Sequence, residues 1–232
     1  CLPASETDYY VLNNARVEQL KSGRIVLPLA KHSAKGEGWS AAKKQYGRLL
    51  CVYSDDGGVT WKKGEEYAPV DAEGKLVLTQ EPGVIELKDG RLYMYARTDR
   101  GRQWQAFSKD GGVTWDDFGP SPIFGPRGPA TIRRLANGDL MLIWNDHEGH
   151  PEYMKLGPEW LVGQRAPLTI AISKDEGKTW IDRRTIEPEV KNGFFCYFAT
   201  LIEGESLLLH YYCRPYLTAS CVTKIRLENE MR

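Results

Sequence analysis

Five polar residues are candidates for binding and transforming an acidic ligand: Arg16, Glu81, Arg97, Arg165 and Tyr197. Guanidinium groups can bind carboxylates through paired, charge-assisted hydrogen bonds, which is chemistry open to an arginine such as Arg97 or Arg165. A glutamate can accept a proton, and a tyrosine hydroxyl can act as a nucleophile. Taken alone, arginines are usually solvated or surface-paired, and aromatic residues are usually core. The chemistry therefore depends on the elements that position these side chains.

An eight-residue motif, S-x-D-x-G-x-T-W, occurs three times, at separations of 54 and 65 residues. Its copies span 54–61, 108–115 and 173–180. Ser and Asp side chains hydrogen-bond to backbone groups two residues on, and Gly supplies positive φ. Each copy, an Asp box, therefore predicts a self-capped turn between two antiparallel strands. Its aspartates are predicted to be structural: Asp56, Asp110 and Asp175.

A second repeat, a hairpin with glycine at the turn, alternates with the first. Its turn glycines are Gly23, Gly90, Gly138 and Gly204. Two hairpins per unit make a four-stranded sheet, and the recurrence about every 60 residues suits the blade of a β-propeller. The predicted fold is therefore all-β, a β-propeller with about four blades present, the last without an Asp box. The alternative is a β-sandwich, but sandwiches do not repeat a turn motif.

The blade register places three of the candidate residues. In a propeller the innermost strand of each blade begins near the central axis, so residues just before that strand face a pocket at one mouth. Counted back from the turn glycine of its own hairpin, Glu81 lies nine residues before it, and Tyr197 and Arg16 each lie seven before it. We expect these three side chains, from three blades, to face one region.

Composition excludes several partners. The 232 residues include 31 Lys plus Arg and 31 Asp plus Glu, so no net field favours nucleic acid or an anionic membrane. No apolar run approaches about 18 residues, and no basic-then-apolar leader opens the chain, so neither a membrane span nor a signal peptide is predicted. At 41% hydrophobic residues, the chain can bury a substantial core.

The cysteines and histidines predict no metal site. No two of the five cysteines form a C-x-x-C pair, and an odd, scattered set indicates buried apolar residues rather than zinc ligands or disulfides. The four histidines lack the spacing of metal ligands. No metal and no cofactor are therefore expected. A start at Cys1 favours a truncated record over a lipid-modified cysteine.

The motifs together resemble the sialidase (neuraminidase) superfamily, in particular its bacterial BNR-repeat branch. The resemblance spans nearly the whole chain and includes the three Asp boxes and the segment 80–87 (QEPGVIEL). Glu81 is followed after sixteen residues by Arg97, and Arg165 precedes the third Asp box and is followed after 32 residues by Tyr197. The order Glu, Arg, Arg, Tyr is that of the family.

The resemblance implies an exo-sialidase that releases terminal sialic acid. In that reading, Arg97 and Arg165 hold the sugar carboxylate. A carboxylate nucleophile would be repelled, so the neutral hydroxyl of Tyr197 attacks the anomeric carbon, and sialidases are a known exception to the two-carboxylate rule. Tyrosine has an ordinary pKa of about 10, so Glu81 is expected to accept its proton. The mechanism retains the anomeric configuration.

The sequence also departs from the family pattern. The sialidase fold has six blades, and neither the family's third arginine nor its aspartate acid has a counterpart here. Arg16 resembles that arginine but lies on the wrong blade, so we expect it to line the pocket wall. We interpret residues 1–232 as one N-terminally truncated propeller domain that alone hydrolyses little or nothing. The family favours a secreted or periplasmic location.

Two other functions fit the same residues. Asp boxes also occur in non-enzymatic propellers, so a module that binds carbohydrate or protein is one alternative. A hydrolase or lyase for another acidic sugar is the second, because an arginine pair recognises carboxylate rather than sialic acid as such. The expected partner is thus a sialylated glycan or another acidic sugar. The segment 145–148 resembles a rim loop, and 147–164 is long enough to shape an aglycone site.

Overall fold

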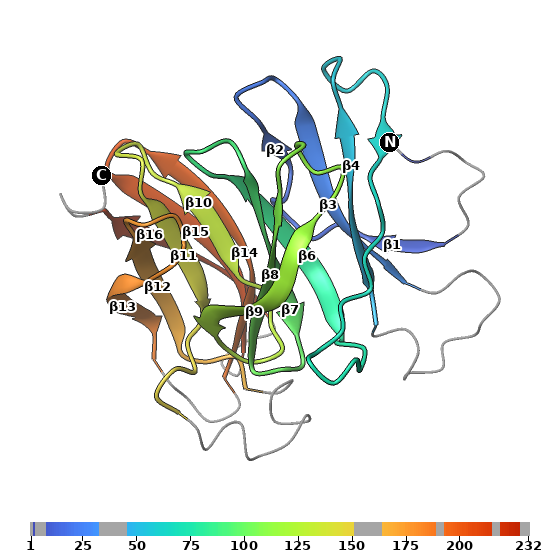
Figure 1. The fold of residues 1–232 in the computed structure, drawn as a ribbon. Coiled ribbons are helices and arrows are strands. Elements are labelled where there is room, and N and C mark those ends of the chain that lie inside the picture. The colour runs from blue at the N-terminus through green and yellow to red at the C-terminus, as the bar shows by residue number, and fades with distance from the viewer. Residues whose placement is uncertain are drawn as a thin grey trace. The chain divides into compact units, whose positions relative to one another are not determined.

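A computed structural model describes residues 2, 8–32, 46–150, 164–188, 193–214 and 219–227. Within these ranges every regular element is a β-strand, and the strands form four antiparallel sheets (Figure 1). The chain divides into two units by its internal contacts. The first, unit 1, comprises Cys1–Arg100 and Trp104–Pro120, and the second, unit 2, comprises Gly101–Gln103 and Ser121–Arg232. The predicted all-β fold with four blades is confirmed.

The first two sheets contain the strands up to residue 124. The first consists of β1 (Tyr9–Val11), β2 (Glu18–Gln19), β3 (Ile25–His32), β4 (Arg48–Ser54) and β5 (Lys62–Lys63). Both β1 and β2 pair with β3, so the first strand of this blade is interrupted by residues 12–17. The second consists of β6 (Thr79–Glu86), β7 (Leu92–Thr98), β8 (Arg102–Ser108) and β9 (Asp116–Phe124), in that order.

The remaining two sheets belong to unit 2. One consists of β10 (Thr131–Arg134), β11 (Leu140–Asn145), β12 (Leu168–Ser173) and β13 (Ile181–Glu187). The last has three described strands, β14 (Phe194–Glu203), β15 (Ser206–Arg214) and β16 (Ala219–Arg226). Every residue of β7, β11 and β12 is buried, which is the pattern of central strands covered on both faces.

The Asp boxes form the predicted turns. They connect β4 to β5, β8 to β9 and β12 to β13. In the first, Ser54 donates to Asp56 Oδ1 at 2.8 Å, Gly58 N donates to Ser54 Oγ at 2.8 Å, and Thr60 N donates to Asp56 Oδ1 at 2.8 Å. The other two copies repeat this network. The structural role predicted for these aspartates is therefore confirmed.

The glycine hairpins also form as predicted, between β2 and β3, β6 and β7, β10 and β11, and β14 and β15. At Gly23 and Gly138 the turn requires a φ of 90°, which side chains with a Cβ rarely adopt. The hairpins and Asp boxes therefore fix where each strand begins and ends. This register is what locates the candidate residues.

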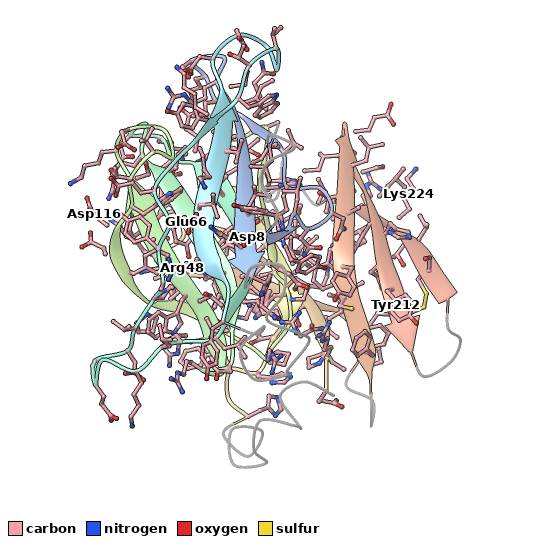
Figure 2. All side chains as sticks on the ribbon, turned by 90° about the vertical axis from the view of Figure 1, so that its right-hand side faces the viewer. Asp8, Arg48, Glu66, Asp116, Tyr212 and Lys224 are labelled. Atoms are coloured by element: carbon pink, nitrogen blue, oxygen red, sulfur yellow. A yellow bond between two sulfur atoms is a disulfide. The ribbon has the colours of Figure 1, made fainter. Side chains whose placement is uncertain are left out.

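A charge network fastens the first blade. The ammonium of Lys31, on β3, lies 2.8 Å from Asp8 and 2.9 Å from Glu66, and Arg48 lies 3.7 Å from the other oxygen of Glu66. Figure 2 labels Asp8, Arg48 and Glu66 around this site. The hydrogen bond that Lys31 donates to Asp8, opposed by burial, raises the pKa of Lys31. The network connects the start of β1 to β3 and to the segment after β5.

The cysteine prediction is wrong in one respect. Cys213, on β15, and Cys221, on β16, form a disulfide with a Cα–Cα distance of 6.3 Å, close to Tyr212 (Figure 2). Their separation of eight residues became informative only once two antiparallel strands brought the side chains together. Cys51 and Cys196 are buried, as predicted, and neither forms a disulfide within the described residues.

Candidate functional site

Both Glu81 and Tyr197 lie on β-bulges in the first strand of their blades. The register of β6 against β7 shifts between Gln80 and Gly83, and that of β14 against β15 shifts between Cys196 and Ala199. At these bulges Glu81 has a φ of 50° and Tyr197 a φ of 60°. Positive φ is uncommon for residues with a Cβ, and bulges and strained backbone cluster at functional sites.

Glu81 is brought together with Arg97. The guanidinium Nη1 of Arg97 donates to Glu81 Oε2 at 2.8 Å, and the two side chains are only 7% and 11% exposed. The contact follows from the sheet, because Gln80 on β6 is the register partner of Arg97 on β7. Unit 1 therefore presents a nearly buried carboxylate and guanidinium side by side, at the start of a blade.

Arg16 lies against the same pair of strands. It is 3% exposed, follows the positive-φ residue Ala15, and donates through Nη1 to the hydroxyl of Tyr95 at 2.8 Å. The Tyr95 ring rests on Gly83, where an added Cβ would lie 2.3 Å from the ring carbon Cζ. Arg16 is thus fixed to the strand pair that carries Glu81 and Arg97, all within unit 1.

Arg165 and Tyr197 are brought together in unit 2. The Arg165 backbone pairs with the start of β14, since Arg165 N donates to Gly193 O at 2.7 Å and Phe195 N donates to Arg165 O at 2.9 Å. Its guanidinium carbon lies 4.4 Å from the ring centre of Phe194 and 5.8 Å from that of Tyr197. Both contacts are of the cation–π type.

The guanidinium of Arg165 has unused hydrogen-bonding capacity. Arg165 is 3% exposed, and its Nε and Nη1 atoms are buried with no hydrogen-bond partner among the described residues. A buried cation without a carboxylate partner is costly, because burial removes its hydration. An anionic ligand that supplies two oxygen acceptors would relieve this cost.

Tyr197 differs from its neighbours in the aromatic run 194–198 (FFCYF). Its side chain is 37% exposed, whereas Phe195 and Phe198 are 2% and 1% exposed. The bulge therefore turns one ring of this run towards solvent while the flanking rings enter the core. Core packing, the ordinary role for such an aromatic residue, does not apply to Tyr197.

The segment 145–148, which the sequence indicates as a rim loop, is partly buried. Asn145 and His147 are 2% and 4% exposed, and Asn145 donates to the backbone oxygen of Arg165 at 2.7 Å. Asp146 and Glu148 instead form ion pairs with Arg183. Burial raises the pKa of Asp146. Residues 151–163, which include most of the expected aglycone segment, lie outside the described residues.

Two further features follow from the residues that the structure describes. Among them, no three His, Cys, Asp or Glu side chains gather in a group that could hold a metal ion. No helix in these ranges has the length and apolar character needed to cross a membrane.

Comparison with known proteins identifies the family. The chain belongs to the BNR repeat-like domain family, whose profile matches residues 2–209. It is 27% identical over 155 residues to a sialidase of Vibrio cholerae, an alignment that covers 57% of this chain and 19% of that protein. It is 26% identical over 200 residues to an anhydrosialidase of Macrobdella decora, covering 82% and 23%. The chain spans about a fifth of the length of these relatives.

Solved structures confirm the fold. The intramolecular trans-sialidase of Ruminococcus gnavus, in complex with oseltamivir carboxylate, aligns with a TM-score of 0.64 at 19% identity, covering 96% of this chain and 45% of that one. The Trypanosoma rangeli sialidase in complex with the inhibitor DANA aligns with a TM-score of 0.60 at 17% identity, covering 91% and 31%. The chain therefore has the sialidase-type β-propeller fold and belongs to the BNR-repeat branch of that superfamily.

Proposed function

We propose that this chain contributes to a sialidase-like glycoside hydrolase that releases terminal sialic acid from glycoconjugates. The observation that carries the proposal lies in unit 2: a buried arginine without an acidic partner among the described residues lies near an exposed tyrosine on a strained bulge. The similarity to sialidases of other organisms supports it.

We assign substrate binding to Arg165 in unit 2, and to Arg97 and Arg16 in unit 1. The carboxylate on the anomeric carbon of sialic acid accepts paired hydrogen bonds from a guanidinium. The rings of Phe194 and Tyr197 lie near the guanidinium of Arg165, and such stacking leaves the in-plane N–H groups available for the sugar. We assign the guanidinium of Arg165 to this carboxylate, because two of its nitrogen atoms have no hydrogen-bond partner among the described residues.

We assign the role of nucleophile to Tyr197 in unit 2 and the role of proton acceptor to Glu81 in unit 1, each on the chemistry of its own side chain. As the glycosidic C–O bond breaks, Tyr197 Oη forms a bond to the anomeric carbon and its proton passes to Glu81. The leaving oxygen takes a proton from a general acid, to which no residue of this chain is assigned. Water then attacks the anomeric carbon as the bond to Tyr197 Oη breaks, the tyrosine recovers its proton from the base, and water gives one proton to the unassigned general acid. The two inversions retain the anomeric configuration.

The test is binding of the dehydrated sialic acid analogue, measured by isothermal titration calorimetry with the 232-residue chain and with the complete gene product. Arg165→Met is expected to weaken binding by about 10- to 100-fold, since a charge-assisted hydrogen bond is worth about 1.5–3 kcal/mol. The control is Arg226→Met in the same unit, because its side chain is 80% exposed and 3.5 Å from its partner Glu205.

Equal affinity of Arg165→Met and Arg226→Met would contradict the proposal. A uronic acid of similar size serves as the competing ligand. Tighter binding of the uronic acid than of the sialic acid analogue would favour a hydrolase or lyase for another acidic sugar over a sialidase. Binding by a complete gene product that cleaves no acidic glycoside would identify a non-catalytic binding module.

A further inference from the structure

We infer that Asn145 is a positioning residue that holds Arg165 and Tyr197 in one geometry, an inference that rests on the proposed function. Asn145 ends β11 and is 2% exposed, so it does not reach the solvent-facing side of the site. Its side chain instead connects two segments that are distant in sequence. One carries Arg165 and the other is the start of β14, which carries Tyr197.

The connection consists of donated hydrogen bonds. The Nδ2 atom of Asn145 donates to Arg165 O at 2.7 Å and to Phe195 O at 3.0 Å, with a longer contact to Pro167 O at 3.3 Å. An amide nitrogen carries two hydrogens, which suffice for the two short bonds. The buried side chain of Asn145 thus binds the backbone of Arg165 and the backbone of the strand that carries Tyr197.

The described backbone pairing between the segment of Arg165 and β14 is short. Its pairing with Phe194 is an isolated parallel bridge rather than part of a longer ladder. Two backbone hydrogen bonds make this bridge, from Arg165 N to Gly193 O and from Phe195 N to Arg165 O. Asn145 therefore adds two side-chain hydrogen bonds to the two backbone hydrogen bonds described between the arginine segment and the strand of the tyrosine.

Only a donor fits this position. Each acceptor around Nδ2 is a backbone carbonyl, so a carboxylate of nearly the same shape would place oxygen against oxygen and lose both donors. An apolar side chain would leave buried carbonyls with fewer donors, which costs about 1–3 kcal/mol. We therefore expect Asn145→Asp and Asn145→Ala to loosen the bridge between Arg165 and Phe195.

Loosening should affect the reaction more than binding. Arg165 keeps its guanidinium in these variants, so the substrate carboxylate is still bound. What changes is the distance from the bound sugar to Tyr197, and a displacement of about 1 Å can lower a rate by about 100-fold. Asn145→Asp is thus expected to lower kcat by about 10- to 100-fold and to change KM by less than about 3-fold.

The experiment uses the complete gene product with a fluorogenic sialoside and compares Asn145→Asp and Asn145→Ala with Ile143→Val. Ile143 lies on the same strand, is fully buried in the core of unit 2 and touches neither candidate residue in any described contact. Its replacement by valine lowers stability by about 0.5–1.5 kcal/mol without altering the bridge. A fall in kcat confined to the Asn145 variants supports the inference.

A second readout is independent of activity. The amide of Phe195 donates to Arg165 O, so its hydrogen exchange reports whether the bridge is closed. Exchange is expected to accelerate at least about tenfold in Asn145→Asp and not in Ile143→Val. Unchanged exchange, or a kcat equal to that of Ile143→Val, would overturn the positioning role. A third outcome separates the two proposals. If Asn145→Asp accelerates the exchange of Phe195 but the unsubstituted protein neither binds nor cleaves sialosides, the proposed function is refuted and the structural role of Asn145 stands.

Discussion

Substitution of Gly83 by alanine is expected to destabilise the protein, because the ring of Tyr95 occupies the space of an added side chain. A Cβ built on Gly83 would lie 2.3 Å from Tyr95 Cζ and 2.4 Å from Tyr95 Oη. Tyr95 is 1% exposed and its hydroxyl accepts the hydrogen bond from Arg16, so the ring cannot move without losing that bond. Gly83→Ala therefore forces either an overpacked core or a broken hydrogen bond.

The magnitude follows from these two terms. Overpacking a core costs about 1–3 kcal/mol, and a hydrogen bond that involves a charged group contributes about 1.5–3 kcal/mol. Because either response relieves the other, the two terms do not add in full. We expect Gly83→Ala to lower the free energy of unfolding by about 2–3 kcal/mol. Urea unfolding followed by tryptophan fluorescence measures this change.

Gly119→Ala is the matched control, since Gly119 also lies in a strand and an added Cβ would find no atom closer than 4.0 Å. A double-mutant cycle with Tyr95→Ala isolates the ring contact. In the Tyr95→Ala background, Gly83→Ala should cost less than about 0.5 kcal/mol, because the obstacle is gone. An equal cost in both backgrounds, or a cost no larger than that of Gly119→Ala, would refute the reasoning.

Three further predictions concern stability. Hydrogen bonds from Thr60 lower the pKa of Asp56 to about 2. The ionised carboxylate therefore stabilises the fold fully above its ordinary pKa of 3.8, and this stabilisation is lost as the pH falls through 2. Acid unfolding of Asp56→Asn should show a weaker pH dependence than that of the wild type. Burial and a hydrogen bond with Glu187 raise the pKa of Tyr211 to about 12. The neutral hydroxyl therefore stabilises the fold fully below pH 10, and this stabilisation is lost as the pH rises through 12. Tyr211→Phe should weaken the pH dependence of alkaline unfolding. Replacing the disulfide of Cys213 and Cys221 with serines should lower the free energy of unfolding by about 2.5 kcal/mol from loop entropy alone, measured in urea, and no change on reduction of the wild type would contradict this.

The fold could be predicted from sequence because its turns are encoded locally. Each Asp box contains the side chains that close its own turn, as the bonds from Thr60 and Ser54 to Asp56 show. The turn glycines likewise need only their own backbone conformation. Three repeats of one motif and four of another therefore determine strand order and register with no knowledge of the core.

The site was predictable only in part. Counting from the turn glycines located Glu81 and Tyr197 at the start of their strands, and the pairing of Glu81 with Arg97 follows from that register. The bulges did not follow, because a positive φ at these residues depends on the surrounding packing rather than on a local motif. Residues of a local motif predict the turn that they form, whereas a bulge depends on the tertiary structure around it.

Two supporting residues carry no sequence signal of their role. Asn145 was apparent only as a polar residue near a loop, since its acceptors, Arg165 O and Phe195 O, are 20 and 50 residues away. Gly83 resembles an ordinary turn glycine after a proline until the Tyr95 ring is seen to occupy its side-chain space. Both roles depend on contacts between strands.

The central claim is that Tyr197 is the nucleophile, and trapping a covalent intermediate tests it most directly. The complete gene product would be incubated with 2,3-difluorosialic acid, digested and analysed by mass spectrometry. We expect one sialyl adduct, on the peptide that contains Tyr197, and its absence in Tyr197→Phe. An adduct on another residue, or an active enzyme that forms no adduct at Tyr197, would contradict the account.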